Sequence, residues 1–173
     1  GHRLDETLAL RLSRVNRVRY AGMERDERFV RMALDEAVVA LEHGDVPVGA
    51  VLVRGDEVVA KAHNTRELVR DATAHAEMLA LRSGAERLGD WRLEGCELFV
   101  TVEPCAMCAG AIVAHRIARL VFGAWNPRAG AAGSLYNVAE DPRLNHRVEV
   151  RRGVLAEECA RPLQGLFEDL RLA

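Results

Sequence analysis

Two short motifs of metal-ligand residues constrain this chain more than any other feature. The first reads TAHAE over residues 73–77, and the second reads EPCAMCAG over residues 103–110. Each motif predicts the first turn of a helix. Thr73 is a favoured N-cap residue, and Pro104 suits the first helical position, where its missing N–H would have had no partner.

The ligand types within these motifs point to zinc. Cys105 and Cys108 are three residues apart, so on a helix they share a face and both sulfurs can reach one ion. A helix N-terminus also favours the thiolate form that binds metal. His75 is a third ligand that zinc accepts alongside sulfur, and three protein ligands leave one tetrahedral position open, as in catalytic sites. Glu77 leaves the helix in a different direction from His75, so we expect it to carry protons.

Other interpretations of the cysteines remain open at this point. A Cys-x-x-Cys pair by itself also occurs in redox proteins and in structural zinc knuckles. Cys96 or Cys159 could complete a closed Cys3His zinc site that has no catalytic role. A disulfide is less favoured, because thiols packed among Ala and Met without a secretion signal usually stay reduced.

Composition limits the class of protein. The 173 residues, of which 49% are hydrophobic and 29% charged, are typical of one soluble globular domain. No apolar run approaches the roughly 20 residues of a membrane span, and the N-terminus lacks a signal-peptide core, so we expect a cytoplasmic enzyme without a membrane partner. The net charge of −2 means that nucleic acid could bind only to local patches. One candidate is the cluster of Arg143, Arg147, Arg151 and Arg152, which could neutralise phosphates or could simply be a solvated strand face.

The hydrophobic pattern predicts one α/β domain over residues 23–173. Residues 1–22 are basic and form a separate extension, either an RNA-contacting arm or sequence foreign to the native chain. Helices are predicted over residues 26–43, 73–88, 104–115 and 155–170. Strands are predicted over residues 46–53, 57–62, 97–102, 119–123 and 147–151. This alternation places helices on both faces of a sheet and the motifs at strand-to-helix turns.

Further segments accompany the two motifs and carry a family resemblance. They are VPVGAVLV at 46–53, Asn64, GA at 123–124, GAAGSL at 130–135 and NHRVE at 145–149. Together with the H-x-E and P-C-x-x-C signature of zinc nucleobase deaminases, they make residues 24–170 resemble the bacterial tRNA-specific adenosine deaminases of the cytidine deaminase-like superfamily. The zinc motifs mark the superfamily, whereas the last two segments favour the tRNA branch.

The resemblance implies a fold and a reaction. The expected fold is the cytidine deaminase-like three-layer α/β/α arrangement with a five-stranded mixed sheet, assembled as a homodimer. The expected reaction is zinc-dependent hydrolytic deamination of adenosine 34, the wobble position, to inosine in a tRNA anticodon stem-loop, with tRNA-Arg as the expected acceptor. By matching position, His75, Cys105 and Cys108 bind one Zn²⁺ per subunit, and Glu77 is the catalytic proton carrier.

The resemblance also suggests substrate contacts. Asn64 would hydrogen-bond the flipped-out base, although a loop Asn can equally bond its own turn. The remaining candidates are the apolar walls Val46, Pro47 and Ala76, the loop residue Asn126, and Asn145 with His146, which either shape the anticodon pocket or cap a strand.

Two other function classes compete with tRNA editing. A free-base or nucleoside deaminase acting on guanine, cytosine or cytidine would use the same zinc chemistry. A non-catalytic zinc-binding module would not need the carboxylate of Glu77. Residues 130–150 argue against the first class, and Glu77 argues against the second.

Asn126 generates a prediction about nucleic-acid selectivity, because many bacterial members of the family carry Asp at this loop position. Loss of the anionic group removes a repulsion beside a nucleic-acid backbone and changes how a ribose 2′-OH is recognised. We predict that this chain discriminates less against deoxyadenosine in single-stranded DNA than its Asn126→Asp variant. Deamination rates on matched RNA and DNA stem-loops test this, and equal RNA-to-DNA activity ratios in the two proteins would contradict it.

Overall fold

The computed structural model describes Tyr20 and residues 22–172 of the chain. The predicted extension over residues 1–22 therefore lies outside the described residues, apart from Tyr20 and Gly22. Tyr20 is only 4% exposed and packs with the core, and its hydroxyl donates a hydrogen bond to Asp35. At least this residue before position 23 thus contributes to the packing of the domain.

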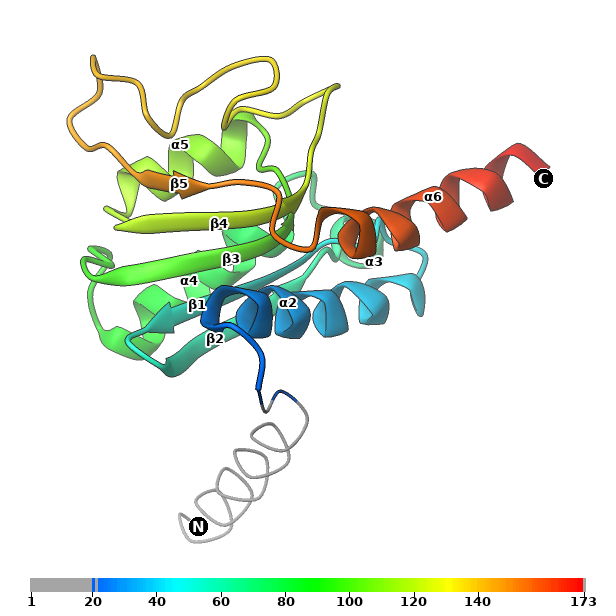
Figure 1. Cartoon of the computed structure of the whole chain (residues 1–173), viewed down its shortest axis with the longest axis horizontal. Helices are drawn as coiled ribbons and strands as arrows, with labels where there is room; N and C mark the ends of the chain where they lie inside the picture. The colour runs from blue at the N-terminus through cyan, green and yellow to red at the C-terminus, as the bar shows by residue number, and fades with distance from the viewer. Residues whose placement is uncertain (1–19, 21, 173) are drawn as a thin grey trace, which may run out of the picture.

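Five strands form one mixed sheet in the order β2-β1-β3-β4-β5 (Figure 1). The strands are β1 Gly49–Arg54, β2 Glu57–His63, β3 Cys96–Val102, β4 Arg119–Ala124 and β5 Glu149–Arg151. β1 pairs antiparallel with β2 and β3, whereas β3, β4 and β5 run parallel. The five-stranded mixed sheet predicted from the resemblance is confirmed.

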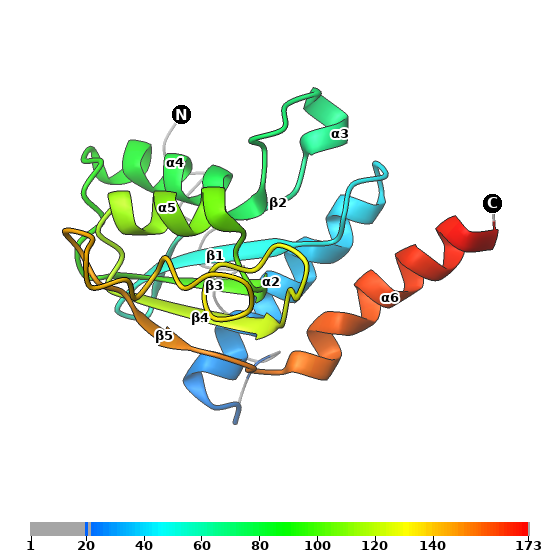
Figure 2. The same ribbon diagram turned by 90° about the horizontal axis from the view of Figure 1, so that it is seen from above.

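Helices cover both faces of this sheet, which gives three layers (Figure 2). The helices are α2 Arg25–Leu41, α3 Arg66–Val69, α4 Ala76–Leu88, α5 Ala106–Ala114 and α6 Ala156–Leu172. α4 and α5 lie on one face, and α2 and α6 lie on the other. The predicted α/β/α fold is therefore confirmed.

The alternation of side chains along the central strands explains the two layers of core. In β3, Leu98 and Val100 join the cluster under α4 and α5, whereas Phe99 between them joins the cluster under α2 and α6. All three side chains are fully buried, as expected for a central strand covered on both faces. The close approach of α2 also requires Gly49, since a Cβ there would lie 1.9 Å from the carbonyl oxygen of Ala33.

Two helix starts differ from the sequence prediction. Thr73 is not an N-cap, because its N–H and hydroxyl both donate to Asp71 at 2.8 Å in a turn before the helix. α4 begins at Ala76, with His75 at the N-cap position. Pro104 does not occupy the first helical position either, since α5 begins at Ala106 with Cys105 at its N-cap.

The short helix α3 was not predicted at all. Its segment lies between the predicted strand over residues 57–62 and the predicted helix over residues 73–88, where no element was predicted. The buried carboxylate of Asp45 accepts hydrogen bonds from the N–H groups of Glu67 (2.8 Å) and Leu68 (3.2 Å) in its first turn. The helix therefore depends on a residue far away in the sequence.

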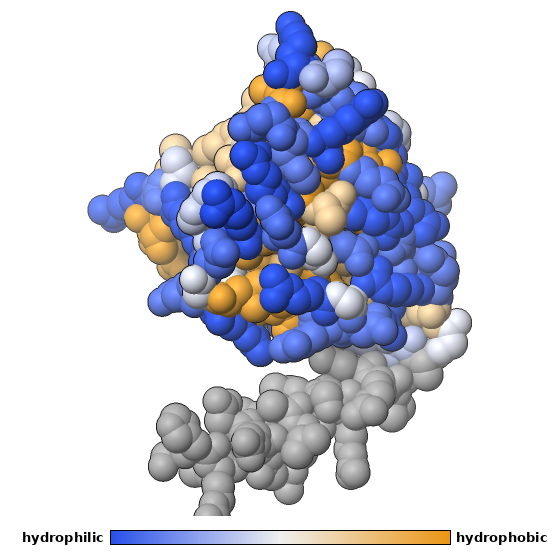
Figure 3. Space-filling model, turned by 90° about the vertical axis from the view of Figure 1, so that its left-hand side faces the viewer, coloured by the Kyte–Doolittle hydropathy of each residue, from blue (hydrophilic) through white to orange (hydrophobic). Residues whose placement is uncertain are grey.

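The surface carries many hydrophilic residues, as expected for a chain in which 29% of the residues are charged. Figure 3 shows one face on which hydrophilic residues predominate and apolar residues form small separate areas. Among the described helices, none is both long and apolar enough to cross a membrane.

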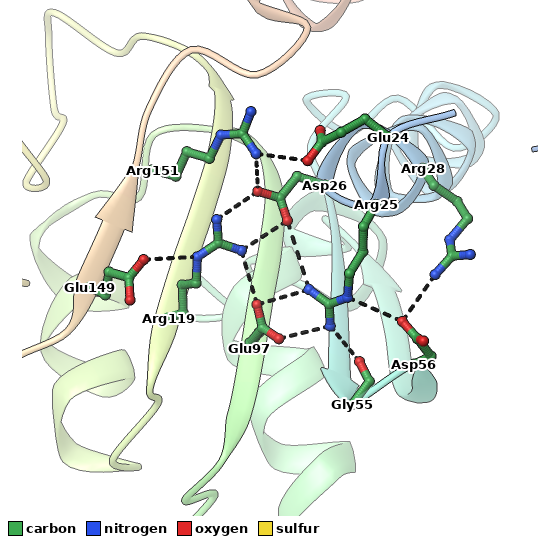
Figure 4. Close-up of polar contacts among 10 residues, drawn as sticks. All are labelled: Glu24, Arg25, Asp26, Arg28, Gly55, Asp56, Glu97, Arg119, Glu149 and Arg151. Carbon is green, nitrogen blue, oxygen red and sulfur yellow. Dashed lines mark hydrogen bonds and ion pairs between the residues drawn. The ribbon is translucent and has the colours of Figure 1, made fainter. Parts of the chain in front are cut away.

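A cluster of charged residues joins α2 to the edge of the sheet where β3 and β4 begin (Figure 4). Asp26, which is 2% exposed, receives bonds from Arg119 (2.6 and 2.8 Å) and from Arg151. Arg119 also bonds Glu97 at 3.0 Å. Burial alone would raise the pKa of Asp26, but the hydrogen bonds from the two arginines outweigh it, so its pKa is lowered.

This cluster predicts a pH-dependent effect of Asp26→Asn on stability. Because the folded state lowers the pKa of Asp26, its contribution is complete above the unfolded pKa of about 3.9 and is lost as the pH falls through the folded value. We expect Asp26→Asn to lower the free energy of unfolding by about 2–3 kcal/mol at pH 7. Denaturation midpoints measured from pH 7 down to pH 3 should show the difference from wild type shrinking below about pH 4. A constant difference at every pH would contradict this account.

Candidate metal centre and substrate site

Three ligand atoms converge at the edge of the sheet where β3 and β4 end. His75 Nδ1 lies 3.7 Å from Cys105 Sγ and 3.6 Å from Cys108 Sγ, and all three atoms lie within 4.8 Å of one another. Cys108 is buried, and the other two residues are partly exposed. The cluster is therefore partly accessible to solvent.

Two helix N-termini place these ligands. His75 and Cys105 are the N-cap residues of α4 and α5, with extended backbone angles (ψ 150° and 175°) that direct the chain out of each helix. Cys108 lies in the first turn of α5. The partial positive charge of both helix ends therefore faces the cluster and favours thiolate over thiol.

The donor set fits a zinc ion. Zn–N bonds of about 2.0–2.1 Å and Zn–S bonds of about 2.3 Å place tetrahedral N and S ligands about 3.6 Å apart. The distances from His75 to the two sulfurs match this separation. His, Cys and Cys would thus hold the ion and leave its fourth position to a non-protein ligand.

A closed Cys3His site is contradicted by the positions of the other cysteines. Cys96 begins β3, at the opposite end of the strand from the ligands. Cys159 lies on α6, on the opposite face of the sheet, where its sulfur would contact a Cβ placed on Gly123. Neither joins the ligand cluster of the described residues. All four cysteines are free, so no disulfide competes for the ligands.

Hydrogen bonds among the three ligands shift their pKa values in different directions. The hydrogen bond from the Cys108 thiol, together with that to His75, lowers the pKa of Cys105 to about 4. The same bond to the Cys105 thiolate, together with burial, raises the pKa of Cys108. The bond to Cys105 also raises the pKa of His75. Binding of a divalent cation would displace the remaining protons from these groups.

Glu77 lies beside this cluster and is 4% exposed. It is the second residue of α4, so it leaves the helix tip next to His75. Burial raises the pKa of its carboxyl to about 7. A carboxyl group in this environment can both accept and release a proton near neutral pH.

The predicted substrate contacts Asn64 and Ala76 lie next to the ligands. The side-chain oxygen of Asn64 accepts the backbone N–H of Ala76 at 2.8 Å, and its own N–H donates to Val48 at 3.1 Å. These bonds bring residues 46–48 beside the start of α4. Pro47 is buried and Val46 partly buried. Because Asn64 Oδ1 is engaged, its amide nitrogen is the group left to donate to a ligand.

Asn126 follows β4 and is linked to the cysteine turn by Glu103, a residue to which the sequence analysis assigned no role. Its backbone N–H donates to the buried carboxylate of Glu103 at 3.0 Å, and its side-chain oxygen accepts the N–H of Ala129 at 3.1 Å. Glu103 directly precedes the Pro104-Cys105 pair. The signal available in the sequence was an acidic residue placed directly after an apolar strand, and the structure shows that this residue is buried.

Asn145 and His146 lie away from the metal ligands of their own chain. Asn145 accepts a bond from Arg116 at 2.8 Å, and His146 Nε2 donates to the carbonyl of Ile117 at 2.7 Å. Both partners follow the C-terminus of α5, and its 9 residues span about 13 Å. The structure therefore does not bring these two residues to the ligand cluster within one chain.

The predicted basic patch is mostly paired with acidic residues. Arg143 bonds Asp141, and Arg152 bonds Glu140. Arg151 bonds Asp26 and Glu24 in the cluster of Figure 4. These pairs favour the interpretation of the patch as a solvated, ion-paired face.

Comparisons with known proteins agree with this geometry. A family model described as the cytidine and deoxycytidylate deaminase zinc-binding region matches residues 23–124. The chain is similar to the tRNA-specific adenosine deaminase of Bacillus subtilis, at 49% identity over 86% of this chain and 92% of the relative.

Solved structures show the same similarity. A chain from a study of A-to-I editing by tRNA:A34 deaminases at the wobble position aligns with a TM-score of 0.75 at 43% identity, over 78% of this chain and 98% of that one. Guanine deaminase from Bacillus subtilis aligns with a TM-score of 0.57 at 29% identity, over 82% and 93%. Similarity is thus greater to the tRNA deaminases than to this free-base enzyme.

The metal centre predicts which cysteines are needed for zinc. We expect Cys105→Ala or Cys108→Ala to reduce the zinc content from one ion per chain to nearly none, because two ligands cannot hold the ion tightly. Cys159→Ala is the matched control, since this buried thiol lies away from the cluster. Elemental analysis after gel filtration measures the zinc. Loss of zinc in the Cys159 variant would show that the ligand set is wrong.

Proposed function

The chain belongs to the cytidine and deoxycytidylate deaminase family, among its tRNA-specific adenosine deaminases, and we propose that it converts adenosine 34 of tRNA to inosine. The observation that carries this proposal is the buried carboxyl of Glu77 beside a three-ligand metal centre. The relatives at 43–49% identity supply the substrate class. We further propose tRNA-Arg as the acceptor.

The reaction replaces an amine by an oxygen. Water attacks C6 of adenine, a C6–O bond forms, the C6–N6 bond breaks, and ammonia leaves. When bound, zinc lowers the pKa of water and so provides the nucleophile near neutral pH. His75, Cys105 and Cys108 would hold the ion for this purpose.

Glu77 supplies the proton transfers. Its carboxylate takes a proton from the attacking water and passes it to N1 of the base, which makes C6 more electrophilic. It then helps to protonate the amine, which can leave only as ammonia. Its buried position excludes bulk water from these transfers.

Asn64, Ala76 and residues 46–48 would hold the base. A single-stranded anticodon loop allows the target base to leave its stack at low cost. The free amide of Asn64 would donate to an acceptor on the base or ribose, while the bond of its oxygen to Ala76 keeps the side chain in place. Ala76, Val46 and Pro47 would form apolar walls, and Asn126 would border the site from the loop after β4.

We propose the remaining properties from the same family assignment. The deaminase domain comprises residues 23–173, and the enzyme works as a homodimer in the cytoplasm. In a dimer, Asn145 and His146 of one subunit would have to reach the substrate of the other, since they lie far from the ligands of their own chain. Light scattering at several protein concentrations measures this association.

Inosine formation tests the proposed function directly. The substrates are an anticodon stem-loop with A34 and, in parallel, free adenosine, cytidine, cytosine and guanine, each with zinc-loaded protein. We expect turnover of the stem-loop alone. Turnover of a free base or nucleoside alone would keep the zinc chemistry but replace the tRNA substrate by the small-molecule alternative.

Glu77→Ala should separate metal binding from chemistry. We expect this variant to keep one zinc ion per chain and its fold, because Glu77 is not a ligand. Its turnover of the stem-loop should fall by about a hundred- to ten-thousandfold, since no proton carrier remains. Glu86→Ala, on the exposed face of the same helix, is the control and should keep full activity. Wild-type turnover in the Glu77 variant would exclude the proposed mechanism.

A further inference from the structure

We infer that Glu103 is a positioning residue that holds residues 126–134 against the cysteine turn and so places the loop that borders the substrate. The inference rests on the proposed function, because it concerns the same substrate. Glu103 is 1% exposed and directly follows β3, the strand that leads into the metal centre. It is not a ligand, since it does not join the His75 cluster.

Four donors from this loop reach the Glu103 carboxylate. One oxygen accepts the backbone N–H groups of Ala132 (3.1 Å) and Ser134 (2.9 Å). The other accepts the backbone N–H of Asn126 (3.0 Å) and the Ser134 hydroxyl. Each oxygen thus receives two bonds, and both ends of the loop are fixed to one side chain. Hydrogen bonds to a charged acceptor contribute more than neutral ones.

Gly130 shows that the loop closes tightly around this carboxylate. A Cβ at Gly130 would lie 2.3 Å from both the carboxyl carbon and an oxygen of Glu103. No other residue type fits there unless the carboxylate or the loop moves. The fit between the glycine and the buried acid is therefore specific.

The same loop contacts the metal-binding turn through its backbone. Gly130 forms an isolated bridge with Cys105, and the N–H of Ala131 donates to the carbonyl of Pro104 at 2.8 Å. Glu103 also donates its own N–H to Ala124 at 2.8 Å, where β4 ends. The loop consequently lies across the turn that presents Cys105. A shift of about 1 Å in such a segment can disturb the placement of the substrate substantially.

Glu103→Gln tests the inference, because a side-chain amide replaces an acceptor with a donor and leaves at least one loop N–H unpaired. Hydrogen exchange of zinc-loaded protein reports the order of the loop. KM and kcat on the A34 stem-loop report the placement of the substrate. Ser134→Ala, which removes only one of the four bonds, is a milder second variant. Asp26→Asn is the matched control, since it removes another buried, hydrogen-bonded carboxylate at the opposite edge of the sheet.

We expect faster exchange of the amides at 126, 132 and 134 in Glu103→Gln, with α2 and α5 unchanged and zinc retained. KM for the stem-loop should rise by about tenfold and kcat should change less. Ser134→Ala should shift both readouts in the same direction by less, and Asp26→Asn should lower stability without changing KM.

Four results would overturn the inference. The first three are unchanged exchange in the loop, an unchanged KM despite faster exchange, and a KM that rises equally in Asp26→Asn. The fourth is loss of zinc, because the carboxylate would then act on the ligands and not on the loop. If wild-type protein does not deaminate the stem-loop, the proposed function fails, while the exchange measurement still decides whether Glu103 orders residues 126–134.

Discussion

The parallel pairing of β3 and β4 is the constraint on which the site depends. Val102 pairs with Ala124, so both strands end at one edge of the sheet, where α/β folds place ligands. The turn carrying Cys105 and the loop starting at Asn126 therefore leave the sheet side by side. The N-terminus of α4 reaches the same edge and adds His75. The metal ligands come from two helices, and the strand pair places the turn that carries the two cysteines beside the loop that starts at Asn126.

Sequence patterns predicted the ligand set because it depends on residue type and spacing, yet they misplaced the start of each helix by a few residues. Thr73 looks like a cap in isolation, but Asp71 accepts both of its donors in a preceding turn. The cap position then falls to His75, whose extended backbone carries its ring towards the cysteines. A pattern of helix formers indicates that a helix exists, whereas competing side-chain hydrogen bonds decide its first residue.

The features that the sequence could not predict are those held by long-range polar contacts. The first turn of α3 is held by Asp45, which lies 22 and 23 residues before its two donors. Glu103 meets its donors 23 to 31 residues later in the chain. No local periodicity encodes such pairs, since the partners become neighbours only after the sheet has formed. The hydrophobic alternation that builds the sheet is local, which is why the five strands were predictable.

Two buried carboxyl groups, Glu77 and Glu103, lie close to the metal ligands in the sequence, and their surroundings shift their pKa values in opposite directions. Glu103 has four donors, which outweigh the effect of burial and lower its pKa, so it stays charged and holds the loop. Burial dominates at Glu77 and raises its pKa to about 7. A carboxylate whose hydrogen bonds outweigh its burial resists protonation, whereas one whose burial outweighs its hydrogen bonds is protonated at a higher pH. We therefore infer that one glutamate, two residues before Cys105, anchors the loop, and we propose that another, two residues after His75, carries protons.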